Sequence, residues 1–379
     1  MDFSLDPEQA VLQEATRGFA RAQLAPGAER RERQGGIDHS VIRTMAAQGL
    51  MGVNVPSRLG GAEAGAVAYA VALREVAAVD ASLAVTMAVT NMVAEVICAF
   101  GTREQRHTFV PQLTGGAYFA GAFALSEPGA GSDAGSLTTR AVCRGDTWVL
   151  NGEKLWITSG DQAGVLVVWA RTDGAGPRGI SAFLLEAGAA GMEVGVPETK
   201  MGLRASHTVP VSFSDVEIPA ANLLGERGDG FRIAMAALDG GRIGIGAQSA
   251  GIASAAIDLS RTFSQGRVQF GQPIASHQAI AAKLADMICE RDAAWLLTLR
   301  AAWLKEQKRP FSQQAAMAKL FASESANRIV REAVQIFGGY GYFEESKVAR
   351  LFRDCRVTQI YEGTSEVQRL VIGRNLLRE

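Results

Sequence analysis

The chain has 379 residues, of which 47% are hydrophobic, and it carries 38 Lys and Arg against 39 Asp and Glu. This length predicts two or three domains, each able to bury its own core. The balanced charge argues against nucleic acid or an anionic membrane as a partner, because proteins that bind these usually carry a clustered basic excess. The apolar content also excludes a disordered chain.

The cysteines and histidines are widely scattered, so we predict neither a disulfide framework nor a metal site. The longest stretch without a charged side chain runs from His107 to Ser126. It contains Pro111 and the pair Gly115-Gly116, which argue against a membrane span. The N-terminus has no basic region before an apolar run, so no secretory signal is predicted. We therefore expect a cytoplasmic protein.

The first domain, residues 1–118, is predicted to be helical. Pro7 opens a helix behind Asp6, and apolar residues at helical spacing indicate another helix over residues 41–50. The Ala-rich stretch 65–100 predicts two further helices that pack closely together.

The second domain, residues 119–228, is predicted to be an antiparallel β domain. Two strands are expected around a turn at residues 144–146, with another turn at Asn151-Gly152. No helical pattern interrupts the strand-like runs that follow, which cover residues 164–170, 180–185 and 209–213.

Helical periodicity returns near Gly228 and marks the third domain, residues 229–379. An apolar stripe over residues 317–337 predicts a helix that stops at Gly338-Gly339. Segment 267–274 separates two helical stretches, and Gln278 is expected one turn into the second of them.

Loop 123–135 brings three glycines together with two serines. Such a loop can hold phosphate oxygens or be an ordinary Gly-rich turn. Its Gly129-x-Gly131-x-x-Ala134 pattern matches a dinucleotide fingerprint only literally, because Pro128 precedes it and strands follow it. Trp156, shortly after the loop, can be a core side chain or a flat platform for a cofactor.

The segment before the last helix holds a second candidate for chemistry. Ser365 and Gln368 fit a capping box, which leaves Glu362 on the preceding turn. Glu362 can be a solvated loop residue or a general base, because desolvation in an apolar cavity raises the pKa of a carboxyl. Arg267 likewise can be a solvated charge or a phosphate contact.

Taken together, these segments resemble the acyl-CoA dehydrogenase family of flavoproteins over nearly the whole chain. The resemblance implies an α+β fold: a helical N-terminal domain, an antiparallel β-barrel-like middle domain and a C-terminal four-helix bundle. It also implies a homotetramer built as a dimer of dimers. The matching motifs are Leu125–Asp133, Trp156–Thr158, Lys200–Arg204, Arg267–Gly271, Gln335–Gly339 and Ile360–Thr364.

The resemblance further implies FAD at the junction of the β domain and the C-terminal helices. Some of the implied cofactor contacts would reach the FAD of a neighbouring subunit, namely Arg267, Gln278, Gln335, Gly338 and Gly339, and Phe270 is a further implied cofactor contact. The implied contacts within one subunit are Phe123, Leu125, Ser126, Gly131, Ser132, Trp156, Ile157, Thr158, Thr364 and Glu366.

Glu362 matches the family's catalytic base, which takes the proton α to a thioester while hydride leaves the β carbon for flavin N5. A backbone N–H near Glu362 is expected to bind the thioester oxygen, where enolate charge develops. The matching substrate contacts are Ser132, Asp239, Arg242 and Gly363. The implied electron acceptor is electron-transfer flavoprotein.

One departure narrows the substrate class. The long-chain and isovaleryl branches carry the base just before this arginine, where this chain has Gly241. We therefore expect a short or short branched-chain acyl-CoA, with a cyclic acyl group still open. Alternatives are a flavin oxidase or monooxygenase on the same fold, and a non-catalytic acyl-CoA-binding relative. An NAD-dependent Rossmann enzyme is the weakest reading, because the βαβ pattern is missing.

Overall fold

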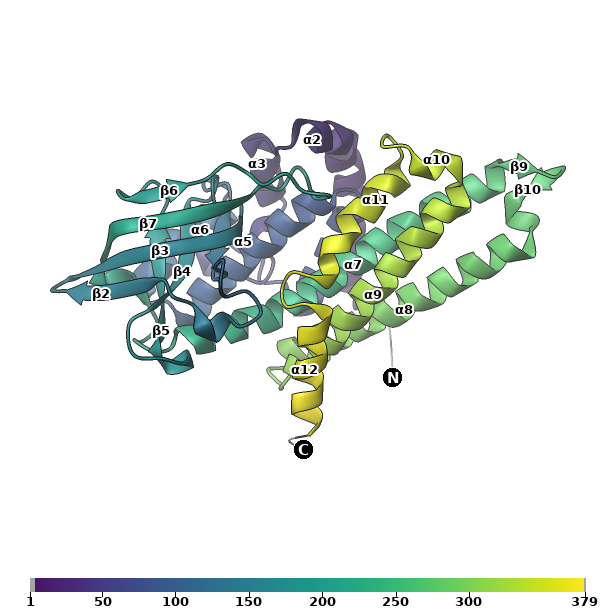
Figure 1. The fold of residues 1–379 in the computed structure, drawn as a ribbon. Helices are drawn as coiled ribbons and strands as arrows, with labels where there is room; N and C mark the ends of the chain where they lie inside the picture. The colour runs from purple at the N-terminus through teal and green to yellow at the C-terminus, as the bar shows by residue number, and fades with distance from the viewer. Residues whose placement is uncertain (1–3, 378–379) are drawn as a thin grey trace.

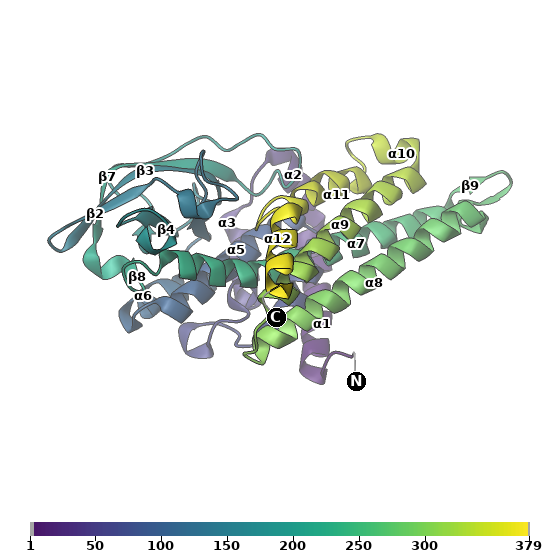
Figure 2. The same ribbon diagram turned by 60° about the horizontal axis from the view of Figure 1, so that its bottom comes forward.

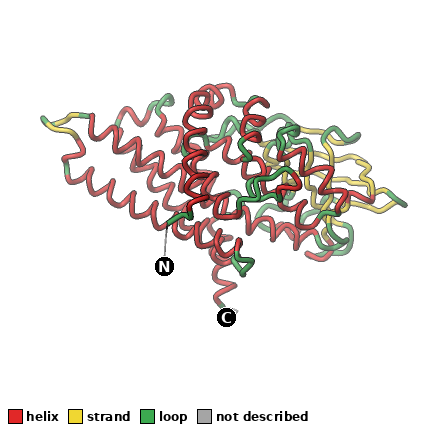
Figure 3. The backbone as a smooth tube through the Cα atoms, turned by 180° about the vertical axis from the view of Figure 1, so that it is seen from behind, coloured by secondary structure: helices red, strands yellow, loops and turns green. Residues whose placement is uncertain are grey.

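The computed structural model describes residues 4–377 and shows helices, then a sheet, then helices along the chain. The strands of the large sheet gather at one end of the molecule, and long helices extend away from them (Figures 1 and 3). The N-terminal helices pack alongside both parts. This arrangement confirms the predicted order of helical, β and helical regions.

The N-terminal region forms the predicted helices. Asp6 caps the first of them through a capping box with Gln9, and Asp80 caps α5 while it pairs with the buried Arg31 at 2.8 Å. The two Ala-rich helices are α4 and α5. The region contains α1 (Pro7–Phe19), α2 (Ala28–Gln34), α3 (His39–Ala47), α4 (Gly65–Ala77), α5 (Ala81–Phe100) and α6 (Arg103–Thr114).

Among residues 4–377, only α5 is long and apolar enough to cross a bilayer, judged by length and composition. Within its most apolar window, 72% of the residues are buried inside the protein, as in a helix of a protein core. The charge-free stretch from His107 to Ser126 is instead divided between α6, a turn and strand β1 (Gly121–Ala124).

The β region forms one eight-stranded sheet in the order β6-β7-β3-β2-β4-β5-β8, with β1 beside β4. Most neighbours are antiparallel, as predicted, but β1 runs parallel to β4 over residues 121–124 and 165–168, and β2 pairs with β4 in parallel at Arg140 and Arg171. The remaining strands are β2 (Arg140–Arg144), β3 (Thr147–Thr158), β4 (Val165–Arg171), β5 (Ile180–Glu186), β6 (Met192–Val194), β7 (Thr208–Pro219) and β8 (Leu223–Leu224).

The turn predicted at Asn151-Gly152 is wrong. Strand β3 continues through these residues, and its register with β7 shifts between Leu150 and Gly152. A Cβ at Gly152 would come within 2.6 Å of the Thr139 hydroxyl oxygen, and the φ of Gly152 is +146°. Gly152 therefore occupies a bulge in strand β3, where a side chain would clash with Thr139.

The C-terminal region consists of long helices that lie side by side (Figure 2). Helix α4 packs on α7 and α8, and α5 packs on α7 and β1, so the three regions share one junction. Hairpin β9 (Val268–Gln269) and β10 (Gln272–Pro273) lies at the end of the bundle farthest from the sheet (Figure 1). The helices are α7 (Gly230–Gly266), α8 (Gln278–Glu306), α9 (Ser312–Phe337), α10 (Gly339–Tyr342), α11 (Lys347–Arg356) and α12 (Ser365–Leu376).

Candidate active site

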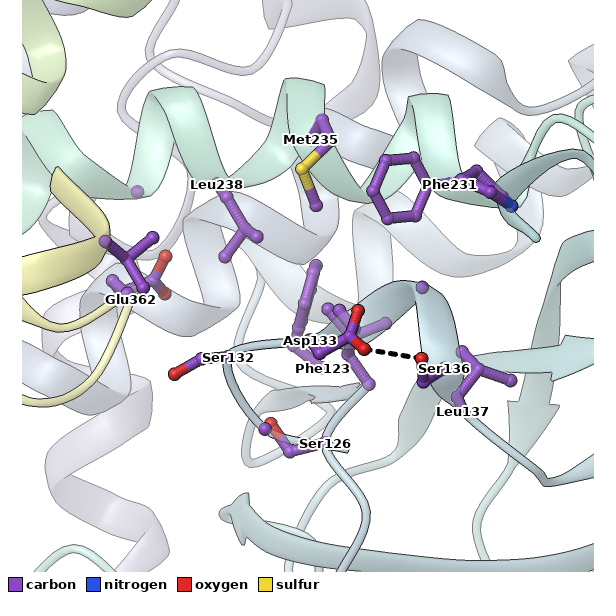
Figure 4. Close-up of a pocket in the computed structure, with 18 of the residues that line it drawn as sticks. Phe123, Ser126, Ser132, Asp133, Ser136, Leu137, Phe231, Met235, Leu238 and Glu362 are labelled. Carbon is purple, nitrogen blue, oxygen red and sulfur yellow. Dashed lines mark hydrogen bonds between the residues drawn. The ribbon is translucent and has the colours of Figure 1, made fainter. Parts of the chain in front are cut away.

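A cavity of about 1130 Å³ lies where the sheet, α5, α7 and the turn before α12 meet. Figure 4 shows Glu362 on one side of it, the Ser126–Ser136 loop opposite, and Leu238 and Met235 of α7 along another wall. Apolar side chains of α5, including Val85, Val89 and Met92, complete the lining. The cavity therefore combines an apolar interior with a small number of polar groups, as ligand sites usually do.

Glu362 lies on a left-handed turn that links a 3-10 segment (Val357–Gln359) to α12. The φ angles of Glu362 and Gly363 are +56° and +87°, and the first is unusual for a residue with a side chain. Gln368 Nε2 donates to the carbonyl oxygens of both residues, at 3.1 and 2.8 Å. These contacts hold the turn in a conformation that costs energy locally.

The predicted capping box of Ser365 and Gln368 is wrong: the N-cap lies one residue earlier and makes a single side-chain hydrogen bond. Thr364, not Ser365, caps α12, and its hydroxyl accepts from Val367 N at 3.3 Å. Ser365 instead donates to Glu324 at 2.6 Å. The side chain of Gln368 is drawn back to the Glu362 turn rather than to the cap, because the turn carbonyls need donors inside the protein.

The carboxyl group of Glu362 lies in a buried environment that changes its pKa. Its Oε2 atom is buried and has no hydrogen-bond partner among the described residues. Burial raises the pKa of Glu362 to about 7, although the positive charges of Arg242 and Lys319 oppose the rise. A carboxyl group with a pKa near neutrality can accept a proton and release it again, which confirms the predicted effect of an apolar cavity.

Gly241 makes room for this carboxyl group. A Cβ at position 241 would lie 2.5 Å from Glu362 Oε2, closer than any normal contact. The residue just before Arg242 and the carboxyl of Glu362 therefore occupy the same part of the cavity. A side chain at position 241 and the observed Glu362 conformation exclude one another.

Arg242 lines the cavity, whereas Asp239 contacts Arg242 from outside it. Arg242 is 5% exposed, lines the cavity and leaves its Nε without a partner. Asp239 is not among the lining residues; its Oδ1 accepts from Arg242 and, at 2.9 Å, from Ser312. Asp239 thus orients the arginine, and the expected direct contact of Asp239 with substrate is not supported by its position.

The Gly-rich loop forms the opposite wall of the cavity. Phe123, Leu125, Ser126, Gly131 and Ser132 all line it. A Cβ at Gly131 would meet nothing within 4 Å, so the loop backbone faces open space there. At Gly131 the loop therefore borders the cavity, while the side chains of Leu125 and Ala130 are buried in the core.

A buried ion pair supports the loop from behind. Lys154 Nζ contacts Glu127 Oε1 at 2.8 Å and Leu125 O at 3.2 Å. The carboxylate of Glu127 also accepts from the backbone N–H groups of Thr138 and Thr139. The pair thus ties the two ends of the loop to strand β3.

The end of β3 supplies a flat side chain and a hydroxyl. Trp156 is 59% exposed and lines the cavity together with Thr158, which favours the platform reading over the core reading. Ile157 points the other way and is 1% exposed in the sheet core. The side chain of Ile157 is therefore not placed to contact a cofactor, because alternate residues of a strand face opposite sides.

The remaining predicted cofactor residues lie away from this cavity in the same subunit. Thr364 and Glu366 do not line it, since Thr364 caps α12 and Glu366 is exposed. Gln278 begins α8 and is not one turn inside it. A group at the far end of the bundle, at or near the β9–β10 hairpin, holds Arg267, Phe270, Gln278, Gln335, Gly338 and Gly339.

The cavity has the features that a flavin requires. The hydroxyls of Ser126, Ser132 and Thr158 make no hydrogen bond to the described residues, so they are free to bind a ligand. The indole of Trp156 offers an exposed face beside them, and aromatic faces of this kind accept a planar heterocycle. The residues present fit the ring and polar groups of FAD.

The sequence patterns did not reveal one polar residue behind the turn, Lys319, or one apolar wall of the cavity. Lys319 is completely buried, and its Nζ donates to Gly363 O at 2.7 Å. A lysine inside the otherwise apolar stripe of residues 317–337 was a signal that could have revealed it. The wall formed by Phe231, Met235 and Leu238 left no such signal, because its residues resemble any amphipathic helix face.

Comparison with known proteins agrees with this geometry. Residues 6–117, 122–216 and 228–377 match the N-terminal, middle and C-terminal domains of acyl-CoA dehydrogenases. The short-chain specific acyl-CoA dehydrogenase from mitochondria of Bos taurus is 46% identical over 97% of this chain and 90% of its own length.

Solved structures extend the comparison. Butyryl-CoA dehydrogenase from Megasphaera elsdenii superposes with a TM-score of 0.97 at 44% identity, covering 100% of both chains. A glutaryl-CoA dehydrogenase from Mycobacterium smegmatis, in complex with FADH2, superposes at 0.94 with 29% identity over 99% of this chain and 96% of that one.

The fold and the cavity thus define a flavin-dependent oxidoreductase that acts on a thioester. The chain belongs to the acyl-CoA dehydrogenase family, and its activity is acyl-CoA dehydrogenation.

Proposed function

We propose that this enzyme converts a short-chain acyl-CoA to the trans-2-enoyl-CoA and that Glu362 removes the α proton. The supporting observation is the buried, unpartnered Oε2 of Glu362 at the apolar cavity. A carboxyl with a pKa near 7 is partly ionised at neutral pH, so it can act as the base there.

The surrounding residues prepare Glu362 for this step. The guanidinium of Arg242 and the ammonium of Lys319 favour the ionised carboxylate, and Asp239 orients the arginine. A backbone N–H near Glu362 would bind the thioester oxygen, and Ser132, which lines the cavity, would contact the CoA arm. Ser126, Trp156 and Thr158 line the cavity and would hold FAD, which would supply the acceptor for the β hydride.

The acyl group is proposed to lie between α5 and α7. Val85, Val89 and Met92 from α5 and Leu238 and Ile245 from α7 give this part of the cavity apolar walls. The two relatives named for short acyl groups support a short chain. Anaerobic titration with acyl-CoAs of graded length and branching, following loss of flavin absorbance, measures the preference directly.

We also propose a homotetramer and electron-transfer flavoprotein as electron acceptor. The tetramer is suggested because Arg267, Phe270 and Gly338 lie far from the cavity of their own subunit, where a neighbour's FAD could reach them. The acceptor follows from the family resemblance. Peroxide release measured against reduction of electron-transfer flavoprotein distinguishes it from the oxidase alternative.

The Glu362→Gln variant tests the assignment of the base. We expect a folded, yellow protein whose flavin is not bleached by acyl-CoA, with kcat reduced by at least about 10²-fold. In the wild type, kcat/KM should rise with pH through about 7 as the free carboxyl ionises. Full bleaching by Glu362→Gln would remove Glu362 from the mechanism.

A further inference from the structure

Lys319 is a charged residue, and the proposed reaction does not require it to contact the substrate. It belongs to α9, is 0% exposed, and has no carboxylate within 4.0 Å of its Nζ among residues 4–377. By contrast Lys154, also 0% exposed, pairs directly with Glu127. Burying an ammonium without an ion pair is costly, so an apolar residue would serve packing better.

The side-chain hydrogen bond of Lys319 is to the turn formed by Glu362 and Gly363. Its Nζ donates to Gly363 O at 2.7 Å, and Gln368 Nε2 donates to the same oxygen at 2.8 Å. The peptide after Glu362 is therefore fixed from two sides. Because Glu362 Oε2 has no partner of its own, the position of the carboxyl depends on this backbone.

The charge of Lys319 also acts on the base. The charged and titratable groups that face Glu362 are Arg242 from α7, Lys319 from α9, Tyr69 from α4 and the neighbouring Tyr361. Burial lowers the pKa of Lys319 to about 8, and the attraction of Glu362 opposes this shift. Glu324 and Glu366 add weaker attraction, whereas Arg242 repels.

We propose that Lys319 is a positioning residue for Glu362, which fixes the Glu362–Gly363 turn through the Gly363 carbonyl and keeps the buried carboxyl ionised at neutral pH. This proposal rests on the assignment of Glu362 as the base. This role explains why a lysine without an ion pair is buried here, which packing alone does not. Without the charge of Lys319, Arg242 would be the one cation facing the Glu362 carboxyl among the described residues.

The test compares Lys319→Met holoenzyme with wild type and with Lys283→Met. The control removes one positive charge from α8, where Lys283 pairs with Glu332 of α9 away from the cavity. The pKa of Glu362 is followed by infrared difference spectroscopy between acid and alkaline pH. The protonated carboxyl band is assigned by its loss when Glu362→Gln is added to each background.

For Lys319→Met we expect the titration midpoint of the Glu362 carboxyl to rise by roughly one pH unit. The pH at which kcat/KM increases should rise by the same amount. At a pH below both midpoints, kcat/KM then falls about tenfold for each unit of that shift. Lys283→Met should leave both midpoints in place. A lysine that only fills space would lower thermal stability without moving either midpoint.

An unchanged Glu362 midpoint in a folded, flavin-bound Lys319→Met protein would overturn the proposal. If that variant does not fold, Lys319→Gln, which is neutral but polar, is measured in the same way with the same two outcomes. The infrared midpoint does not depend on turnover. Failure of the proposed function, seen as full bleaching by Glu362→Gln, is therefore distinguishable from failure of the role of Lys319.

Discussion

At the scale of single residues, the site depends on a glycine, Gly241, whose lack of a side chain leaves room for Glu362. Gly241 precedes Arg242 on α7, and a Cβ there would lie 2.5 Å from Glu362 Oε2. Glycine in a helix interior lowers the stability of the helix by roughly 0.5–1 kcal/mol relative to alanine. At position 241 this loss is accompanied by room for the Glu362 carboxyl. The carboxyl of Glu362 can reach the cavity because this position is empty.

Gly241→Ala should therefore separate stability from activity. We expect unchanged or higher thermal stability but a fall in kcat/KM of about 10²-fold, since a displacement of the base by about 1 Å is costly to catalysis. Gly240→Ala is the matched control, because its Cβ would meet only the flexible end of Lys305, at 3.2 Å. Equal kinetics for both variants would show that the carboxyl tolerates a neighbour at position 241.

At the scale of elements, the Gly-rich loop is held by charge. Burial alone would raise the pKa of Glu127, but Lys154, together with the Thr139 hydroxyl and the Thr138 backbone, lowers it to about 2. The pKa of Lys154 is lowered to about 8 by burial, against the attraction of Glu127. Both groups are therefore charged at neutral pH, and each depends on the other.

Lys154→Met should destabilise the loop and weaken the cofactor site. Leaving Glu127 buried without its partner is expected to cost about 3–5 kcal/mol of stability. Thermal melting and the ratio of bound FAD to protein measure the two effects. The double variant with Glu127→Gln should recover part of both, because the amide can still accept from Thr138 and Thr139. A single variant that melts like wild type would contradict the role of this pair.

At the scale of the whole molecule, the end of the helical bundle carries a surface that suits another subunit. Phe270 is 94% exposed, and the nearby Tyr340 and Phe343 are 59% and 65% exposed. Large aromatic side chains exposed together commonly mark a protein interface. The proposed tetramer would cover them and bring Arg267 close to a neighbour's FAD.

Phe270→Asp is expected to weaken both assembly and cofactor retention while each subunit stays folded. A charge in the centre of an apolar interface is poorly tolerated, because it must lose its hydration. Light scattering after gel filtration gives the mass, and absorbance gives the FAD content. Val11→Asp, at another apolar position that is 70% exposed, is the control. A tetramer that keeps its flavin despite Phe270→Asp would contradict this surface as the interface.

The amino-acid sequence by itself determined the order of the regions and the candidate base. Helical periodicity, strand-like runs and caps such as Asp6 are local signals, and they depend on residues close together in the chain. The residues alone left Glu362 as either a solvated loop residue or a general base, and the resemblance of its short motif to the family singled it out as the candidate base. Errors of one residue, as with Thr364 and Ser365, arose because both side chains are able to cap a helix.

Only the tertiary structure decided which residues meet in the cavity. Gly241, Lys319 and Glu362 belong to α7, α9 and the turn before α12, and their contacts join segments tens of residues apart. The same holds for Asn151-Gly152, where pairing with β7 overrode a turn signal. The pKa of a buried carboxyl depends on desolvation and on charges supplied by other elements, and these exist only once the chain has folded.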